Sequence, residues 1–125
     1  MESKLFGMNA LALSIFEINK EKGFWDKERN IGEMLMLVTS ELGEAMEAHR
    51  KGKFANWENF EKDKSNVGEN SAFQNHIKDS FEDEIADAVI RLLDMSAGLG
   101  INLEKQIEAK INYNKTREKL HGKKY

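Results

Sequence analysis

Apolar residues recur every three or four positions along most of the chain, a spacing that is typical of amphipathic helices rather than strands. Four helices are predicted in this way, over residues 5–20, 28–51, 80–99 and 102–119. Three glycines that commonly end helices follow the predicted segments: Gly23, Gly52 and Gly100. Ser80, with Asp83 three positions later, and Asn102 are suitable N-caps for the last two helices. The sequence contains no proline, so the predicted fold class is all-α.

The segment between the second and third predicted helices, residues 53–79, lacks this periodicity. Gly, Asn, Ser, Lys and Asp are mixed there with four aromatic residues: Phe54, Trp57, Phe60 and Phe73. A long irregular insert is therefore predicted between helices two and three. Such inserts in small domains are usually functional or mobile.

Composition narrows the class of protein without changing this picture. The length of 125 residues suits one domain, so a single domain over residues 1–125 is expected. The absence of cysteine excludes disulfides, thiolate zinc sites and a cysteine nucleophile. The formal charge of −3 gives no general attraction for nucleic acid or for an anionic membrane, so neither is expected as a partner.

The start of the chain and its hydropathy bear on location. The first residues, Met-Glu-Ser-Lys, lack the basic-then-apolar pattern of a signal peptide. No run approaches the roughly 18 apolar residues that a membrane span requires. A cytoplasmic location is the resulting expectation.

Carboxylates interrupt the apolar face of the second predicted helix. On a helical wheel, Glu41 falls within the stripe made by Met34, Leu37, Val38, Leu42, Ala45 and Ala48. Glu44 lies at the edge of this stripe, one turn further along on the same side. A buried carboxylate is costly unless it is paired or binds a metal ion. The alternative is that Glu41 reaches solvent or meets an arginine.

The third predicted helix also carries two carboxylates three residues apart, but here the apolar surface is wide and the polar stripe is narrow. It is apolar around most of its circumference, and its narrow polar stripe contains Glu84, Asp87, Arg91 and Asp94. Taken alone, the stripe could be a thin solvent-facing edge. Two helices that each carry a carboxylate pair at i and i+3 can instead supply four oxygen ligands, from Glu41, Glu44, Glu84 and Asp87. Mg²⁺, or Mn²⁺ as a substitute, prefers such ligands.

A di-iron site is disfavoured, because carboxylate-bridged di-iron bundles need Glu-x-x-His on two helices. Glu118 and His121 match this spacing, but the sequence has no second copy. EF-hand loops, phosphate-cradling glycine loops and nucleophile elbows are also absent from the sequence.

The last predicted helix carries cations near its apolar seam. Lys110, Asn114 and Arg117 continue the line of Leu103 and Ile107, which are expected to face inward. The positive charges of Lys110, Lys115 and Arg117 could neutralise phosphate oxygens, and Asn114 could bind a sugar hydroxyl or a phosphate. The alternative is an ordinary basic helix end that complements the helix dipole.

Together, these segments resemble a known family. The segment Glu41-Leu-Gly-Glu44-Ala-Met-Glu-Ala, with Glu84-Ile-Ala-Asp87 after an insert, resembles the signature of the MazG-like branch of the all-α NTP pyrophosphatases. The phrases Gly23-Phe-Trp-Asp26 and Tyr113-Asn-Lys-Thr-Arg117, with His121-Gly-Lys-Lys after the latter, are also similar to that group. The resemblance extends from about residue 20 to the end of the sequence.

The resemblance implies a four-helix-type bundle that forms a homodimer or homotetramer. It also implies Mg²⁺-dependent hydrolysis of nucleoside or deoxynucleoside triphosphates to a monophosphate and pyrophosphate, by attack of water on the α-phosphorus. Carried over to this sequence, the metal and catalytic residues are Glu41, Glu44, Glu84 and Asp87. The substrate contacts are Lys110, Asn114 and Arg117.

Two interpretations stay open beside the resemblance. Trp25 is a candidate for the base pocket, and it could equally be a core residue that anchors the connection between the first two helices. The alternative function is a non-catalytic helical module that binds nucleotides or acts in regulatory assembly, for which Mg²⁺ would make no difference.

Overall fold

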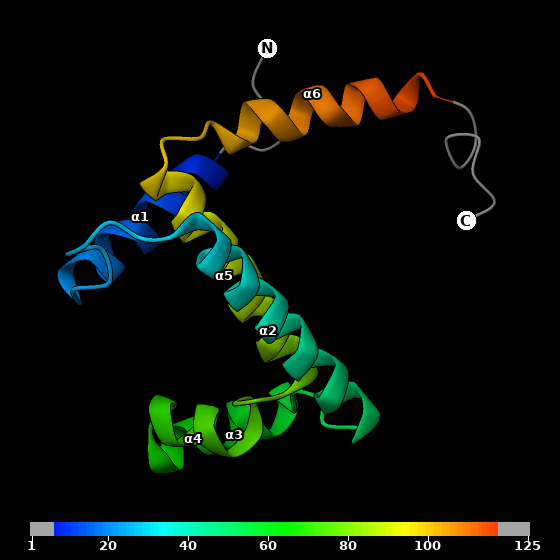
Figure 1. Ribbon diagram of the computed structural model, residues 1–125. Helices are drawn as coiled ribbons and strands as arrows, with labels where there is room; N and C mark the ends of the chain where they lie inside the picture. The colour runs from blue at the N-terminus through cyan, green and yellow to red at the C-terminus, as the bar shows by residue number, and fades with distance from the viewer. Residues whose placement is uncertain (1–6, 118–125) are drawn as a thin grey trace. The chain divides into compact units, whose positions relative to one another are not determined.

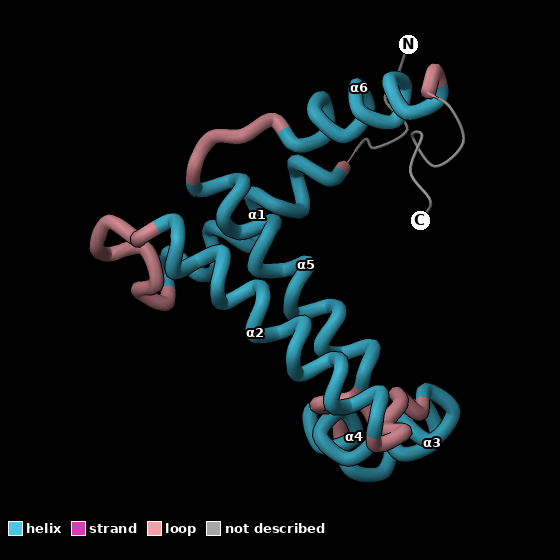
Figure 2. Tube along the Cα trace, turned by 45° about the vertical axis from the view of Figure 1, so that its right-hand side comes forward, coloured by secondary structure: helices cyan, strands magenta, loops and turns pink. Residues whose placement is uncertain are grey.

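The computed structural model describes residues 7–117, and these form α-helices joined by short connections, without strands in that range (Figures 1 and 2). The helices are α1 (Met8–Glu21), α2 (Ile31–Arg50), α3 (Trp57–Val67), α4 (Glu69–His76), α5 (Phe81–Gly98) and α6 (Leu103–Lys115). The predicted all-α class is confirmed. None of these helices is both long enough and apolar enough to cross a membrane.

Contacts divide the chain into two compact units. The α2–α5 unit is Trp25–Leu92, and the terminal unit combines Met1–Phe24 with Leu93–Tyr125. Helix α5 begins in the α2–α5 unit and ends in the terminal unit. The two predicted carboxylate pairs fall within the α2–α5 unit, and the predicted cations of α6 fall within the terminal unit.

Helix α2 and the first half of α5 run side by side in opposite directions (Figures 1 and 2). At one end of the pair the rings of His49 and Phe81 are 5.3 Å apart, and the Phe81 N–H donates to the Lys53 carbonyl. The buried residues of α2 recur at alternating four- and three-residue steps: Met34, Val38, Glu41, Ala45 and Ala48. Such a narrow seam is the pattern by which two helices pack lengthwise. Glu41 lies within this seam, as predicted.

The caps of these helices follow the predicted chemistry. The Ser80 hydroxyl accepts a hydrogen bond from the Asp83 N–H at 3.2 Å, which caps α5. The Asn102 side chain caps α6 by accepting from the Lys105 N–H at 3.1 Å. The start of α2 differs slightly from the prediction, because Asn30 accepts from the Glu33 N–H at 2.9 Å and the helix therefore begins at Ile31.

The prediction of an irregular insert over residues 53–79 is wrong, because this segment contains α3 and α4. Asn56 caps α3 by accepting from the Asn59 N–H at 3.0 Å, and Gly68 separates the two helices with a positive φ of 89°. A small core holds the resulting hairpin together: Phe60, Ala72 and Ile77, with Ala55 and Phe73 against them. Each helix is too short to repeat its apolar spacing often enough for a periodic signal.

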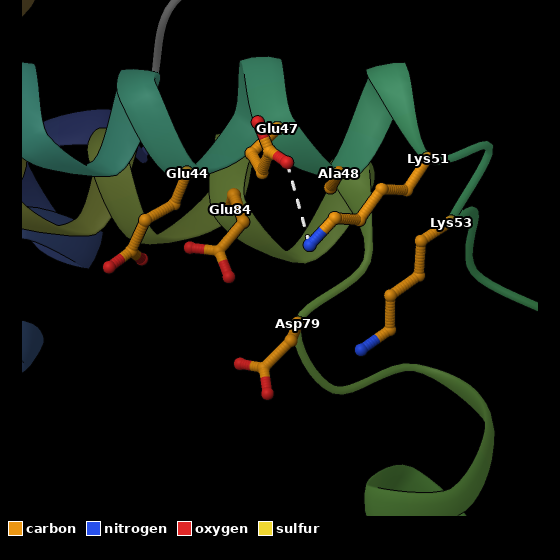
Figure 3. A pocket seen from close by; sticks show the side chains of 7 residues that line it. All are labelled: Glu44, Glu47, Ala48, Lys51, Lys53, Asp79 and Glu84. Atoms are coloured by element: carbon orange, nitrogen blue, oxygen red, sulfur yellow. Dashed lines mark ion pairs between the residues drawn. The ribbon is translucent and has the colours of Figure 1, made fainter.

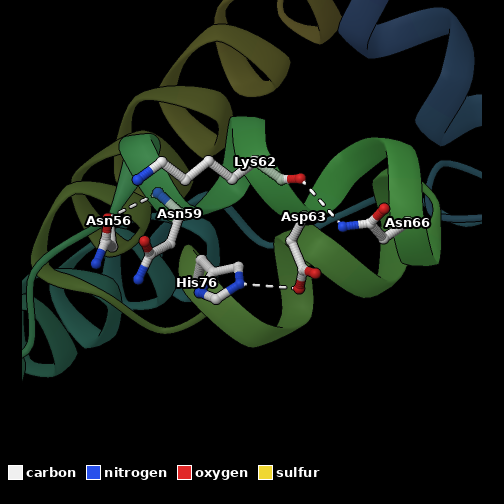
Figure 4. Close-up of polar contacts among 6 residues, drawn as sticks. All are labelled: Asn56, Asn59, Lys62, Asp63, Asn66 and His76. Carbon is white, nitrogen blue, oxygen red and sulfur yellow. Dashed lines mark hydrogen bonds and ion pairs between the residues drawn. The ribbon is translucent and has the colours of Figure 1, made fainter.

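A polar contact between the side chains of His76 and Asp63 also holds this hairpin together (Figure 4). The His76 ring nitrogen Nε2 lies 3.1 Å from Oδ2 of Asp63, which links the end of α4 to α3. A cleft of about 260 Å³ adjoins this pair and is lined by Asn59, Lys62, Asp63, Asn66 and His76. The Asn56 N–H donates to the His76 carbonyl at 2.9 Å, so the two ends of the hairpin meet at its base.

In the terminal unit, α1 and α6 are joined at their N-terminal ends by reciprocal hydrogen bonds. The Asn9 N–H donates to Glu104 at 2.9 Å, and the Glu104 N–H donates back to the Asn9 side chain at 3.2 Å. The Asn9 amide also donates to Asn102 at 2.8 Å. Helix α1 begins at Met8 and α6 ends at Lys115, and the predicted outer bounds at residues 5 and 119 lie outside the described residues.

The polar stripe of α5 does not form a solvent-facing edge. Glu84 and Asp94 are only 4% and 5% exposed, whereas the apolar side chain of Val89 is 47% exposed. The polar side of the first half of α5 instead faces α2, because Arg91 and Glu84 both approach carboxylates of that helix. The apolar side is therefore turned outward.

Candidate metal centre

Three carboxylates from two helices converge within the α2–α5 unit. Glu41 comes from the buried seam of α2, and Glu84 and Asp87 come from successive turns of α5. One oxygen from each of the three lies within 4.8 Å of the others. Oxygen ligands at roughly 2.1 Å from one Mg²⁺ can be about 4.2 Å apart at most, so small side-chain movements would bring all three onto one cation.

Glu84 is the most deeply buried member of this group. Its side chain is 4% exposed, and its Oε2 atom is buried without a hydrogen-bond partner among residues 7–117. A buried polar atom that lacks a partner costs about 1 to 3 kcal/mol, and more if the group is charged. The position therefore favours either a protonated carboxyl group or an ionised one that holds a cation.

Electrostatics agree with this interpretation. Burial is the main cause that raises the pKa of Glu84 from 4.5 to about 8, and the adjacent side chains of Glu44 and Glu41 act in the same direction. Burial also raises the pKa of Asp87, together with the negative charges of Asp83 and Glu41, while Arg91 lowers it. A divalent cation would reverse both shifts, because it stabilises the ionised carboxylates.

Glu41 has a cationic partner of its own. The Arg91 guanidinium donates from Nε to Oε1 of Glu41 at 3.0 Å, and the Glu41 side chain is 11% exposed. The alternative left open by the sequence, that Glu41 meets an arginine, is thus observed. The ion pair therefore uses one of the two carboxylate oxygens of Glu41.

Glu44 lies beside this group but outside the set of three. It is exposed, and its carboxylate and that of Glu84 point to the same side of the two helices (Figure 3). Its proximity to Glu84 is also seen in its effect on the pKa of that residue. The prediction that Glu44 is a fourth ligand stays a prediction.

A cleft of about 390 Å³ opens next to Glu44 and Glu84 (Figure 3). It is lined by Glu44, Glu47, Ala48, Lys51, Lys53, Asp79 and Glu84. Within it, the Lys51 ammonium lies 3.4 Å from Oε1 of Glu47. Sequence reasoning missed the two lysines. A usable signal was present, because they flank Gly52 at the end of the helix that carries Glu41 and Glu44.

The predicted substrate contacts Lys110, Asn114, Lys115 and Arg117 are exposed and belong to the terminal unit. The predicted place of Lys110, Asn114 and Arg117 along an inward-facing seam is wrong, because these three side chains are exposed and α6 has no buried residue. Lys110 and Arg117 instead flank the Tyr113 ring, at 5.3 and 5.5 Å from its centre. A contact between these cations and the carboxylates stays a prediction.

Trp25 is partly buried at the start of the α2–α5 unit. The guanidinium of Arg29 lies 5.1 Å from the centre of its ring, a cation–π contact within the connection that leads into α2. This contact gives Trp25 a local structural role, and its part in a base pocket stays a prediction.

Comparison with known proteins adds no relative. A scan against protein-family models, a search of curated proteins and a search of solved structures each gave no match.

Proposed function

We propose that this protein is a metal-dependent hydrolase that converts nucleoside or deoxynucleoside triphosphates to monophosphates and pyrophosphate. The observation that carries the proposal is the buried Oε2 of Glu84, which has no hydrogen-bond partner among the described residues and lies within a group of three carboxylates from two helices. The resemblance of the two acidic motifs to MazG-like pyrophosphohydrolases supplies the substrate class and the reaction.

The donor set favours Mg²⁺ or Mn²⁺ as the cation. Glu41, Glu84 and Asp87 offer carboxylate oxygens from two helices. Hard divalent cations prefer such ligands, whereas zinc and iron sites usually include nitrogen or sulfur. The cation would supply Lewis acidity and lower the pKa of a bound water.

The residues around the cation divide into different roles. Glu84 would release its proton and hold the metal, while Arg91 keeps the Glu41 carboxylate oriented through its hydrogen bond. Glu44 is exposed to the cleft, so we assign it the role of accepting a proton from the attacking water. Lys110, Asn114 and Arg117, with Lys115, are proposed to bind the phosphates or the sugar.

A panel of NTPs and dNTPs, incubated with the protein and Mg²⁺, tests the proposal directly. We expect pyrophosphate and a nucleoside monophosphate as the products, and a loss of at least about a hundredfold in turnover for Glu84→Gln. The far-ultraviolet circular dichroism of this variant should match the wild type. Absence of pyrophosphate release across the whole panel would contradict the proposed reaction.

The Arg91–Glu41 ion pair favours a second candidate, a non-catalytic module that binds nucleotides or acts in regulatory assembly. In this case Arg91 alone would compensate the buried negative charge, and Mg²⁺ would be unnecessary. The two candidates differ in a measurement that needs no substrate. The hydrolase must bind Mg²⁺ through Glu84, whereas the second candidate is indifferent to Mg²⁺.

A further inference from the structure

The cleft beside Glu44 and Glu84 contains two cations whose role the proposed hydrolase does not yet use. Lys51 and Lys53 lie at its far end from the carboxylate pair (Figure 3). Lys51 is paired with Glu47 at 3.4 Å, but both side chains are more than half exposed. Such a surface pair is weak, so a stronger anion can displace Glu47 from Lys51.

The Lys53 ammonium group makes no hydrogen bond or ion pair within residues 7–117. A cation without a partner on the wall of a cleft is available to an anionic ligand. In Figure 3 the Lys53 side chain extends toward Asp79.

The backbone at Lys53 is held from both sides. The Lys53 N–H donates to the Ala48 carbonyl at 2.8 Å, and the Gly52 N–H donates to the His49 carbonyl at 3.0 Å. These two hydrogen bonds form a Schellman motif at the end of α2. Gly52 has the positive φ of 67° that this motif requires. The Lys53 carbonyl accepts from the Phe81 N–H at 2.9 Å, so Lys53 is fixed between the end of α2 and the start of α5.

The charges of the cleft imply an order of binding. Three carboxylates, from Glu44, Glu47 and Asp79, face two ammonium groups, and Glu84 adds a fourth negative charge when it ionises. The C-terminal end of α2 adds negative potential. A bare anion is therefore repelled. A divalent cation on Glu84 would neutralise the excess negative charge, after which the lysines can attract phosphate oxygens.

We propose that Lys53, assisted by Lys51, forms a phosphate subsite that binds the terminal phosphates of a polyphosphate whose inner phosphate faces the metal. The subsite binds its anion only when the metal is present. This inference rests on the proposed function. It assigns the leaving pyrophosphate to the α2–α5 unit, which leaves the inner phosphate or the sugar to the proposed contacts of α6. The cleft volume is within the range of roughly 300 to 1,000 Å³ that is usual for ligand pockets.

Isothermal titration calorimetry of the full chain tests the subsite with inorganic pyrophosphate as the probe. Mg²⁺ binding is measured first, and pyrophosphate is then titrated with and without saturating Mg²⁺. We expect pyrophosphate to bind only with Mg²⁺, and Lys53→Ala to weaken this binding roughly ten- to hundredfold. Lys53→Arg, which keeps the charge, should stay within a few-fold of the wild type.

Two further variants separate a specific subsite from a general charge effect and from a merely structural role, respectively. Lys62→Ala removes the same charge from the exposed face of α3, where Lys62 pairs with Glu58, and it should be silent. Glu47→Gln releases Lys51 and removes a negative charge, so it should tighten pyrophosphate binding a few-fold. A merely structural role for the cleft residues would not produce this gain.

The outcomes distinguish the subsite from the proposed function. If Mg²⁺ binds normally but Lys53→Ala behaves like Lys62→Ala, the subsite is overturned and the metal centre stands. Pyrophosphate binding of equal strength without Mg²⁺ would overturn the order of binding. If the wild-type chain does not bind Mg²⁺ at all, the proposed function fails, and the subsite fails with it.

Discussion

At the scale of single residues, Glu84 carries the strongest conflict between stability and function. A buried carboxyl group beside three other carboxylates opposes folding as soon as it ionises. Functional sites often retain such groups, because the property that destabilises the fold is the one that binds a ligand.

The pH dependence of stability follows from this residue. The folded chain keeps the Glu84 proton up to about pH 8, whereas the unfolded chain releases it near pH 4.5. The metal-free protein should therefore lose stability as the pH rises through this range, and the raised pKa of Asp87 acts in the same direction. Thermal unfolding in EDTA across this range measures the loss, and Mg²⁺ should restore stability at the upper end.

Replacement of Glu84 by glutamine should stabilise the metal-free protein. At about pH 8.5 we expect Glu84→Gln to raise the free energy of unfolding by about 1 to 3 kcal/mol, because the buried charge is removed. The same variant should lose its response to Mg²⁺. Glu58→Gln, on the exposed face of α3, is the control and should change neither property. A destabilised Glu84→Gln protein that still responds to Mg²⁺ would place the metal elsewhere.

At the scale of elements, α2 and α5 were predictable because each is long, capped and periodic over several turns. The same periodicity placed Glu41 on the packing face and put Glu84 and Asp87 on one side of their helix. The residues of the three-carboxylate cluster could therefore be predicted from their spacing alone. The place of Lys51 and Lys53 in the cleft could not be predicted in this way, because the position of Lys53 depends on the Schellman motif and on its hydrogen bond with Phe81. Helices α3 and α4 were missed because their core comes from a few residues contributed by both helices and their flanks.

Two glycines of these elements should respond to alanine in opposite directions. Gly68 joins α3 to α4 with φ 89° and ψ 160°, a region that only glycine visits readily, so Gly68→Ala should cost about 1 to 3 kcal/mol. Gly43 lies inside α2, and a methyl group added there would project into open space, so Gly43→Ala should stabilise by about 0.5 to 1 kcal/mol. Chemical denaturation measures both.

Amide hydrogen exchange locates the Gly68 effect. Protection should fall in α3 and α4 and persist along α2, because the hairpin has a core of its own. A uniform loss of protection along α2 as well would mean that the hairpin and the carboxylate helices unfold together.

At the scale of the whole molecule, the apolar residues that the chain leaves exposed are the main unexplained feature. Outside its buried seam, α2 exposes a second apolar line formed by Leu35, Leu42 and Met46. The first half of α5 exposes Ile85, Val89 and Leu92, again at helical spacing. Contiguous apolar surface of this kind is uncommon on monomers and marks an interaction surface.

We therefore expect the active form to be a homodimer or homotetramer, as the resemblance also implies. Analytical ultracentrifugation at micromolar concentration should give a mass of at least twice the 14.4 kDa of one chain. Val89→Asp should shift the protein toward monomer, because a charge at an apolar contact is costly to bury. Ser71→Asp, on the exposed face of α4, is the matched control and should leave the mass unchanged. An active wild-type monomer would contradict the prediction, and the apolar lines of α2 and α5 would then require a partner other than a second copy of this chain.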